Sequence, residues 1–219
     1  MQLRCAALLF DLDGVLVDSR AVVERVCRRW AARHNLDPDA LLRIAHGRRT
    51  RDTVRTVAPQ LDLEPEVAWL DNAELEDTEG LVEVPGVRQF LSGIPADRWA
   101  VVTSCGPALA RLRLSSVAMP IPPILVTADD VSNGKPAPDG YRLGARRLGV
   151  EPSSCIVFED APPGIAAGRA AGARVIALRT THPDADFSNA DAMIPDFTGI
   201  SVRGEQAACV VTIRDAGLV

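Results

Sequence analysis

Two carboxylates stand one residue apart near the start of the chain, directly after a short apolar run. Residues 6–10 are apolar and predict a buried strand, Asp11 and Asp13 follow it, and Gly14 permits a sharp turn. We therefore expect both acids just beyond a central strand, where open α/β sheets bind ligands. Such a pair can divide the roles of nucleophile and proton donor and can share a Mg²⁺ ion. The same pattern also fits a loop with solvated acids.

A single lysine gives the acidic pair a plausible partner. Lys135 is the only lysine of the chain, whereas every other cationic side chain is an arginine. Pro136 and Pro138 flank it in the run Asn-Gly-Lys-Pro-Ala-Pro-Asp and restrict the backbone there. A compact ammonium group on a rigid loop can neutralise Asp11 and a bound phosphate together.

Two further polar pairs follow predicted strands. Thr103 and Ser104 end the apolar run 99–102, and a hydroxyl with free backbone N–H groups at that turn can hold a phosphate. Alone, this pair is more typical of a helix cap. Glu159 and Asp160 end another apolar strand, so they are either caps of the next helix or ligands of a hard cation. Because Asp11 is expected at the end of a central strand, the metal site is the favoured interpretation.

These four segments, in this order and spanning residues 8–173, resemble the four motifs of the phosphatase branch of the haloacid dehalogenase superfamily. The resemblance implies that Asp11 is the nucleophile and Asp13 the general acid/base, with Thr103 and Lys135 completing the catalytic set. It also implies that Mg²⁺ binds at Asp11, at Asp13 through its backbone carbonyl, and directly at Asp160. Glu159 binds the ion directly or through water.

The remaining sequence predicts the scaffold that positions these residues. From residue 81 onward, strand and helix patterns alternate, which indicates an α/β fold with a Rossmann-like, doubly wound parallel sheet. Residues 17–81 show helix patterns instead. We therefore predict a core domain of residues 1–16 and 82–219, with an inserted α-helical cap domain of residues 17–81.

A cap loop suggests the substrate class. His46, Gly47, Arg48 and Arg49, followed by Thr50, resemble the cap loop of small sugar- and polyol-phosphate phosphatases. Together with Ser104, the first four are the predicted substrate-binding residues. The alternative interpretation of the loop is a solvated turn between helices.

Several reactions share this scaffold, so the fold alone does not decide the chemistry. Asp13 and the Glu159–Asp160 pair argue against a dehalogenase, and a cap without lysine argues against a phosphonatase. A β-phosphoglucomutase-like enzyme is the main alternative, although Val23 stands where that family carries a histidine. A non-catalytic binding protein on the same scaffold is the other alternative. A phosphatase acting on a small sugar or polyol phosphate fits best.

Bulk properties narrow the partners. The chain has 219 residues and a net charge of −5 without a basic tail, which argues against nucleic acid as a partner. It has no apolar run long enough for a membrane span. Five scattered cysteines without metal spacing indicate reduced thiols. We expect a cytoplasmic monomer that binds a small-molecule phosphate ester.

Overall fold

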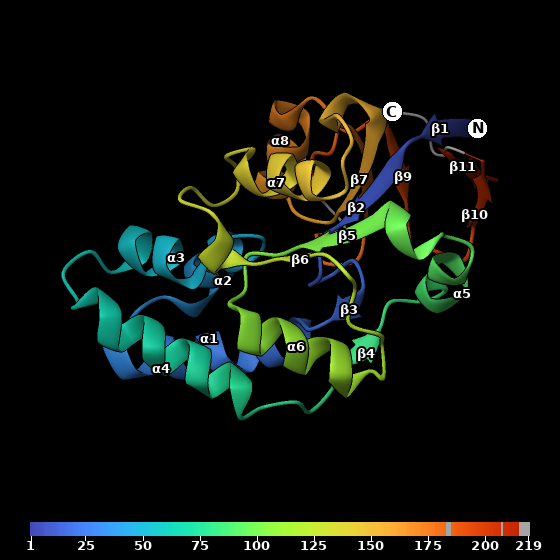
Figure 1. Ribbon diagram of the computed structural model, residues 1–219. Coiled ribbons are helices and arrows are strands. Elements are labelled where there is room, and N and C mark those ends of the chain that lie inside the picture. The colour runs from blue at the N-terminus through green and yellow to red at the C-terminus, as the bar shows by residue number, and fades with distance from the viewer. Residues whose placement is uncertain (183–184, 207, 215–219) are drawn as a thin grey trace.

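A six-stranded parallel sheet forms the centre of the computed structural model, which describes residues 1–182, 185–206 and 208–214. The strand order is β6-β5-β2-β7-β8-β9, so the strand that leads to Asp11 lies inside the sheet between two neighbours. Figure 1 shows this sheet in the upper half of the molecule. The strands are β2 (Ala7–Phe10), β5 (Trp99–Val102), β6 (Leu125–Val126), β7 (Cys155–Glu159), β8 (Arg174–Leu178) and β9 (Ala192–Ile194).

Both faces of the sheet are covered, which explains why its inner strands are continuous apolar runs. Leu8 and Phe10 of β2 belong to one hydrophobic cluster, together with side chains of α5 (Val87–Ser92) and α6 (Pro107–Ser116). Ala7 and Leu9 point to the opposite cluster, which includes side chains of α7 (Asp139–Arg147) and α8 (Pro162–Ala171). The α/β architecture with a doubly wound parallel sheet is confirmed.

A second, antiparallel sheet was not predicted as such. It joins β1 (Gln2–Cys5) to β11 (Ala208–Ile213), and β11 in turn to β10 (Ile200–Glu205). The sequence analysis assigns no strand to β1 or β10. Both have polar residues at alternate positions and one partly solvated face, a weaker signal than a buried apolar run.

Four successive helices follow the first strand of the main sheet, within residues 20–75. They are α1 (Arg20–His34), α2 (Pro38–Ala45), α3 (Thr50–Val57) and α4 (Leu63–Leu75). They share a hydrophobic cluster built around Val26, Trp30, Val54 and Leu70. Figure 1 shows α1 and α4 below the sheet, next to α6. These helices make up the segment assigned to the cap by sequence.

A two-stranded ribbon stands where the chain enters and leaves these helices. β3 (Val17–Asp18) pairs antiparallel with β4 (Val82–Glu83), which brings the two connections side by side. The sequence shows no strand signal there, because two residues are too few for a period to be visible.

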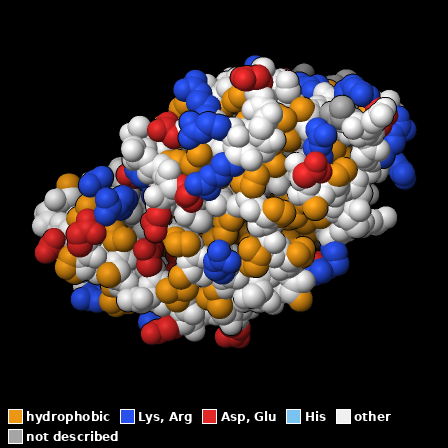
Figure 2. All heavy atoms as spheres, in the orientation of Figure 1, with side chains coloured by type: hydrophobic (Ala, Val, Ile, Leu, Met, Phe, Trp, Pro, Cys, Tyr) orange, Lys and Arg blue, Asp and Glu red, His pale blue; other side chains and the backbone are white. Residues whose placement is uncertain are grey.

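In the described part of the chain, no helix combines the length and hydropathy that crossing a membrane requires. Figure 2 shows acidic and basic side chains interspersed with hydrophobic ones on one face of the molecule.

Candidate active site

Asp11 and Lys135 meet at the carboxyl end of the central strand. The loop between β6 and α7 carries the lysine, whose Nζ lies 2.7 Å from Asp11 Oδ1 and 2.6 Å from Glu159 Oε1. Both side chains of the first pair are buried. Burial raises the pKa of Asp11 to about 7, although the positive charge of Lys135 acts in the opposite direction. The pKa of Lys135 is raised because the carboxylates of Asp11 and Glu159 outweigh the effect of its burial. The predicted contact between the single lysine and Asp11 is present in the structure.

Glu159 is held by donors on both carboxylate oxygens. Oε1 accepts hydrogen bonds from Lys135 Nζ and from the hydroxyl of Tyr141, the latter at 2.7 Å. Oε2 accepts from the backbone N–H groups of Asp160 at 3.0 Å and Ala161 at 3.3 Å. With four donors and no exposed surface, this carboxylate is fixed in place and in turn fixes the lysine.

Asp160 presents a buried oxygen that lacks a partner. Its Oδ1 forms no hydrogen bond with any described residue. Burial raises the pKa of Asp160 well above its ordinary value, and the charges of Glu159 and Asp11 raise it further. Carboxylate oxygens of these three acids all lie within 4.8 Å of one another. An orphaned acidic oxygen in a crowded cluster of carboxylates suits a hard divalent cation.

The turn after β2 needs glycine for two reasons. Gly14 has φ +76°, a conformation that side chains other than glycine rarely adopt. A Cβ at this position would also lie 2.0 Å from Asp160 Oδ2 and 2.4 Å from Thr181 Oγ1. The turn can therefore press directly against the acidic cluster only because residue 14 has no side chain.

Asp13 faces a partner that the sequence analysis missed. Arg113 of α6 is completely buried, and its Nε lies 2.7 Å from Asp13 Oδ1. The same guanidinium contacts the carboxylate of Glu74 on α4. Cys105 donates its S–H to Asp13 Oδ2 at 3.0 Å. Burial raises the pKa of the Cys105 thiol well above its usual value, so this cysteine is a neutral donor and not a thiolate nucleophile.

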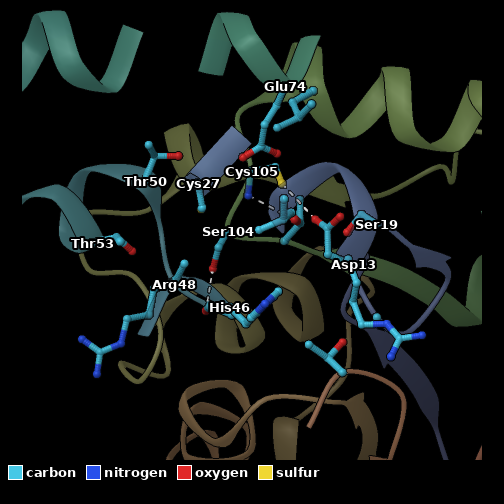
Figure 3. Close-up of a pocket in the computed structure, with 18 of the residues that line it drawn as sticks. Asp13, Ser19, Cys27, His46, Arg48, Thr50, Thr53, Glu74, Ser104 and Cys105 are labelled. Carbon is cyan, nitrogen blue, oxygen red and sulfur yellow. Dashed lines mark hydrogen bonds between the residues drawn. The ribbon is translucent and has the colours of Figure 1, made fainter. Parts of the chain in front are cut away.

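Thr103 stabilises the turn after β5, and Ser104 contacts the predicted cap. Thr103 Oγ1 accepts a hydrogen bond from the backbone N–H of Cys105 at 3.1 Å. Ser104 donates its hydroxyl to the carbonyl of Gly47 at 3.1 Å, a bond visible in Figure 3. Gly47 has φ +75°, and a Cβ there would lie 2.6 Å from Cβ of Ala161. The predicted cap loop therefore packs directly on the segments that follow β5 and β7.

The four predicted cap residues have different positions. His46, Gly47 and Arg48 line the cavity beside Asp11 and Asp13. Burial lowers the pKa of His46 to about 4, so its imidazole, which packs edge-on against His182, is neutral near pH 7. Arg49 lies outside this cavity.

The Arg49 side chain connects the cap to the lysine loop. It pairs with Asp52 at 2.7 Å and donates to the carbonyl of Ser132 at 3.1 Å. A Cβ at Gly134, the residue before Lys135, would lie 2.5 Å from Arg49 Nε. Arg49 therefore packs against the loop that carries Lys135 and does not line the cavity.

The cavity lies between the strand ends and the helices, with a volume of about 90 Å³. Figure 3 shows Asp13, Ser104 and His46 on one side, Thr50 and Thr53 on another, and Glu74 above Cys105. Among its walls are the apolar side chains of Val23, Cys27, Leu41, Leu70 and Leu109. Apolar walls with a few polar groups are typical of sites for small molecules, although this volume is smaller than that of a usual ligand pocket.

Arg113 and Glu74 left a signal in the sequence. In α6, Leu109, Ala110, Arg113 and Leu114 form the buried stripe, so a cation occupies a position whose helical period is apolar. Glu74 likewise stands four residues after the buried Leu70 of α4, on the same side of the helix. A charge on an apolar stripe needs a buried partner, and this is how both residues could have been found.

The fold and the site together define a class of protein: an α/β protein with a doubly wound parallel sheet that carries an acidic cluster and a lysine at the carboxyl ends of its strands. Residues 5–172 match the haloacid dehalogenase-like hydrolases, and the chain belongs to that family.

Individual relatives cover nearly the whole chain. Hexitol phosphatase A of Escherichia coli is 39% identical over 217 residues, which are 95% of this chain and 99% of the relative. Glycerol-1-phosphate phosphohydrolase 2 of Saccharomyces cerevisiae is 32% identical over 222 residues, covering 94% and 88%. The crystal structure of CbbY from Rhodobacter sphaeroides in complex with phosphate superposes with a TM-score of 0.74 at 22% identity, covering 88% of this chain and 95% of that one. This last likeness concerns the fold.

Proposed function

We propose that this protein is a Mg²⁺-dependent phosphatase that hydrolyses a small sugar or polyol phosphate through an aspartyl-phosphate intermediate. The observation that carries the proposal is the position of Lys135, whose ammonium bridges the candidate nucleophile Asp11 and the fixed Glu159, while Asp11 also lines the cavity. The names of the relatives give the substrate class, since the two reported above act on hexitol and glycerol phosphates.

The acidic cluster fits a divalent cation. Asp11 and Asp160 supply the ligand oxygens, because Asp160 Oδ1 is buried without a partner and Asp11 is bound by lysine through only one oxygen. Glu159 has donors on both oxygens and serves chiefly to position Lys135, so of the two alternatives that the sequence leaves open we favour binding through water over direct coordination. The bound ion would supply positive charge against which two anions can approach each other.

The reaction follows from the positions of the two aspartates. An oxygen of Asp11 attacks phosphorus, the bond from phosphorus to the alcohol oxygen breaks, and the carboxyl of Asp13 gives its proton to that oxygen. Water then gives a proton to the Asp13 carboxylate and attacks the aspartyl-phosphate, which releases phosphate and restores Asp11. Lys135 and the turn at Thr103 stabilise charge on the transferring group.

The helical segment 17–81 acts as a cap in this proposal, with the core formed by residues 1–16 and 82–219. The loop at Gly47 rests on Ser104 and Ala161, so lifting it exposes the strand ends and setting it down excludes water. The proposed enzyme works as a monomer in the cytoplasm.

The test is an assay of the purified protein with Mg²⁺ against hexitol, hexose and glycerol phosphates, with p-nitrophenyl phosphate as a generic substrate. We expect release of phosphate that requires Mg²⁺ and is abolished by Asp11→Asn, whereas Asp97→Asn, an exposed change of the same type, leaves it intact. Conversion of β-glucose 1-phosphate to glucose 6-phosphate without phosphate release would indicate the mutase. Binding without turnover would indicate a non-catalytic protein.

A further inference from the structure

One wall of the cavity carries opposite charges that the proposed chemistry does not use. Arg113 of α6 and Glu74 of α4 contact each other there, and both line the cavity. Figure 3 shows Glu74 reaching down from its helix toward Cys105 and Asp13. Both side chains are largely buried, so the structure carries the desolvation cost of an ion pair at this position.

The pair has unused hydrogen-bonding capacity. Arg113 Nη1 is buried and has no hydrogen-bond partner among the described residues. The contact with Glu74 uses Oε2, and no described residue hydrogen-bonds its Oε1. Thr53 Oγ1, on the facing helix α3, is also buried without a partner. Buried donors and acceptors are rarely left unsatisfied, so Arg113 Nη1 and Thr53 Oγ1 point to a polar ligand.

The wall lies close to the leaving group. Arg113 Nε is 2.7 Å from Asp13 Oδ1, and Asp13 is the group that protonates the departing alcohol oxygen. A hydroxyl bound by Arg113 and Glu74 therefore lies on a carbon next to the esterified carbon, or one further along. Leu70 and Leu109 line the same space and suit the carbon chain between hydroxyls.

The sign of the charge on Glu74 also matters. A carboxylate at this wall repels a second phosphate or a carboxylate at the far end of a substrate. Arg113 does not compensate, because it already faces two carboxylates, Asp13 and Glu74.

We propose that Glu74 and Arg113 bind a hydroxyl of the leaving alcohol close to the ester oxygen, and that Glu74 excludes substrates with a second anionic group. The preferred substrates are then monophosphates of uncharged polyhydroxy alcohols, and sugar bisphosphates are poor ones. This inference rests on the proposed phosphatase function and refines its substrate class.

The test compares kcat/KM for matched pairs of substrates. Sorbitol 6-phosphate and 5-deoxysorbitol 6-phosphate differ only in the hydroxyl next to the ester carbon, and fructose 1-phosphate and fructose 1,6-bisphosphate differ in a second phosphate. We expect the wild type to prefer the first member of each pair by about 100-fold, since a site built around a hydroxyl rejects an analogue that lacks it.

Two variants separate the hydrogen bond from the charge. Glu74→Gln should reduce both preferences by about tenfold or more, because it removes the charged acceptor. Glu74→Asp keeps the charge but withdraws the carboxylate by one methylene, so it should weaken only the preference for the hydroxyl. Glu76→Gln, an exposed change at the C-cap of α4, is the control and should alter neither.

The outcomes are distinguishable from failure of the proposed function. No hydrolysis of any ester, including p-nitrophenyl phosphate, would refute the phosphatase itself. Hydrolysis with equal rates for the deoxy analogue, or with both preferences unchanged in a folded Glu74→Gln variant, would refute the inference and leave the phosphatase standing. Circular dichroism melts establish that each variant is folded.

Discussion

Gly164→Ala tests whether Glu159 must stay in its observed position for Lys135 to work. Gly164 lies in the first turn of α8, and a Cβ there would be 1.7 Å from Glu159 Oε1 and 2.0 Å from its Cδ. Cβ contacts under 3.0 Å are essentially never found. The carboxylate must therefore move by about 1.3 Å, the difference between that limit and 1.7 Å. A movement of this size breaks the 2.6 Å contact with Lys135 and the 2.7 Å contact with Tyr141.

The expected effects follow from that displacement. Breaking a buried ion pair costs about 3–5 kcal/mol, and replacing glycine by alanine within a helix returns about 1 kcal/mol. The net loss of about 2–4 kcal/mol lowers Tm by roughly 4–16 °C for a chain of this size. Misplacing a catalytic group by about 1 Å costs about 100-fold in rate, so kcat should fall by about that factor.

The assay is phosphate release at saturating substrate and Mg²⁺, with a thermal melt of the same sample. Gly199→Ala is the control, since its Cβ would meet nothing within 4 Å. In a Glu159→Asp background the shorter side chain leaves room for the new methyl, so Gly164→Ala should then cost little further activity. A single Gly164→Ala variant with wild-type kcat and Tm would refute the idea that Glu159 positions the lysine.

Two other expectations follow from the same cluster. Lys135→Arg should lower kcat by about 100-fold or more and also lower Tm, because a planar guanidinium replaces a compact ammonium on a side chain that is only 6% exposed. Steady-state kinetics and a thermal melt measure both effects. An unchanged kcat would mean that any positive charge suffices. The rise in Tm on adding Mg²⁺ should grow as pH increases from about 5 to above 7 and should vanish in Asp160→Asn. Burial raises the pKa of Asp11 from 3.8 to about 7, so protonation of Asp11 stabilises the metal-free fold at low pH. This contribution to stability is lost as pH rises toward 7. The metal ion then binds where the proton was. Melts with Mg²⁺ or EDTA across this range measure the difference, and a difference that is largest at pH 5 would contradict it.

The sequence is most informative where function sits on strand ends. Asp11, Lys135 and Asp160 could be brought together in advance, because the carboxyl ends of parallel strands lie at the same edge of a sheet. Asp160 follows β7, the neighbour of β2, and the lysine loop follows β6, two strands away on the other side. The buried strands of the main sheet were equally predictable, since continuous apolar runs bounded by glycine and proline leave few alternatives.

The sequence is least informative where packing between helices decides. Whether Arg49 or Arg48 reaches the cavity depends on a rotation of about one residue at the start of α3, which hydrophobic period alone does not fix. The contact of Arg113 with Glu74 joins two helices that are distant in sequence. Neither element pattern predicts how far α4 slides along α6. These are also the residues on which substrate choice depends in our proposal.

The three hydrophobic clusters of the molecule have an evolutionary consequence. Two of them flank the main sheet, and the third draws its residues from positions 22–81 alone. Substitutions that repack the third cluster leave the apolar contacts beneath Asp11 and Lys135 intact, and distant changes of this kind add nearly independently in stability. Substrate preference can therefore change during evolution through substitutions in this segment, while the residues proposed to transfer the phosphoryl group remain under separate selection.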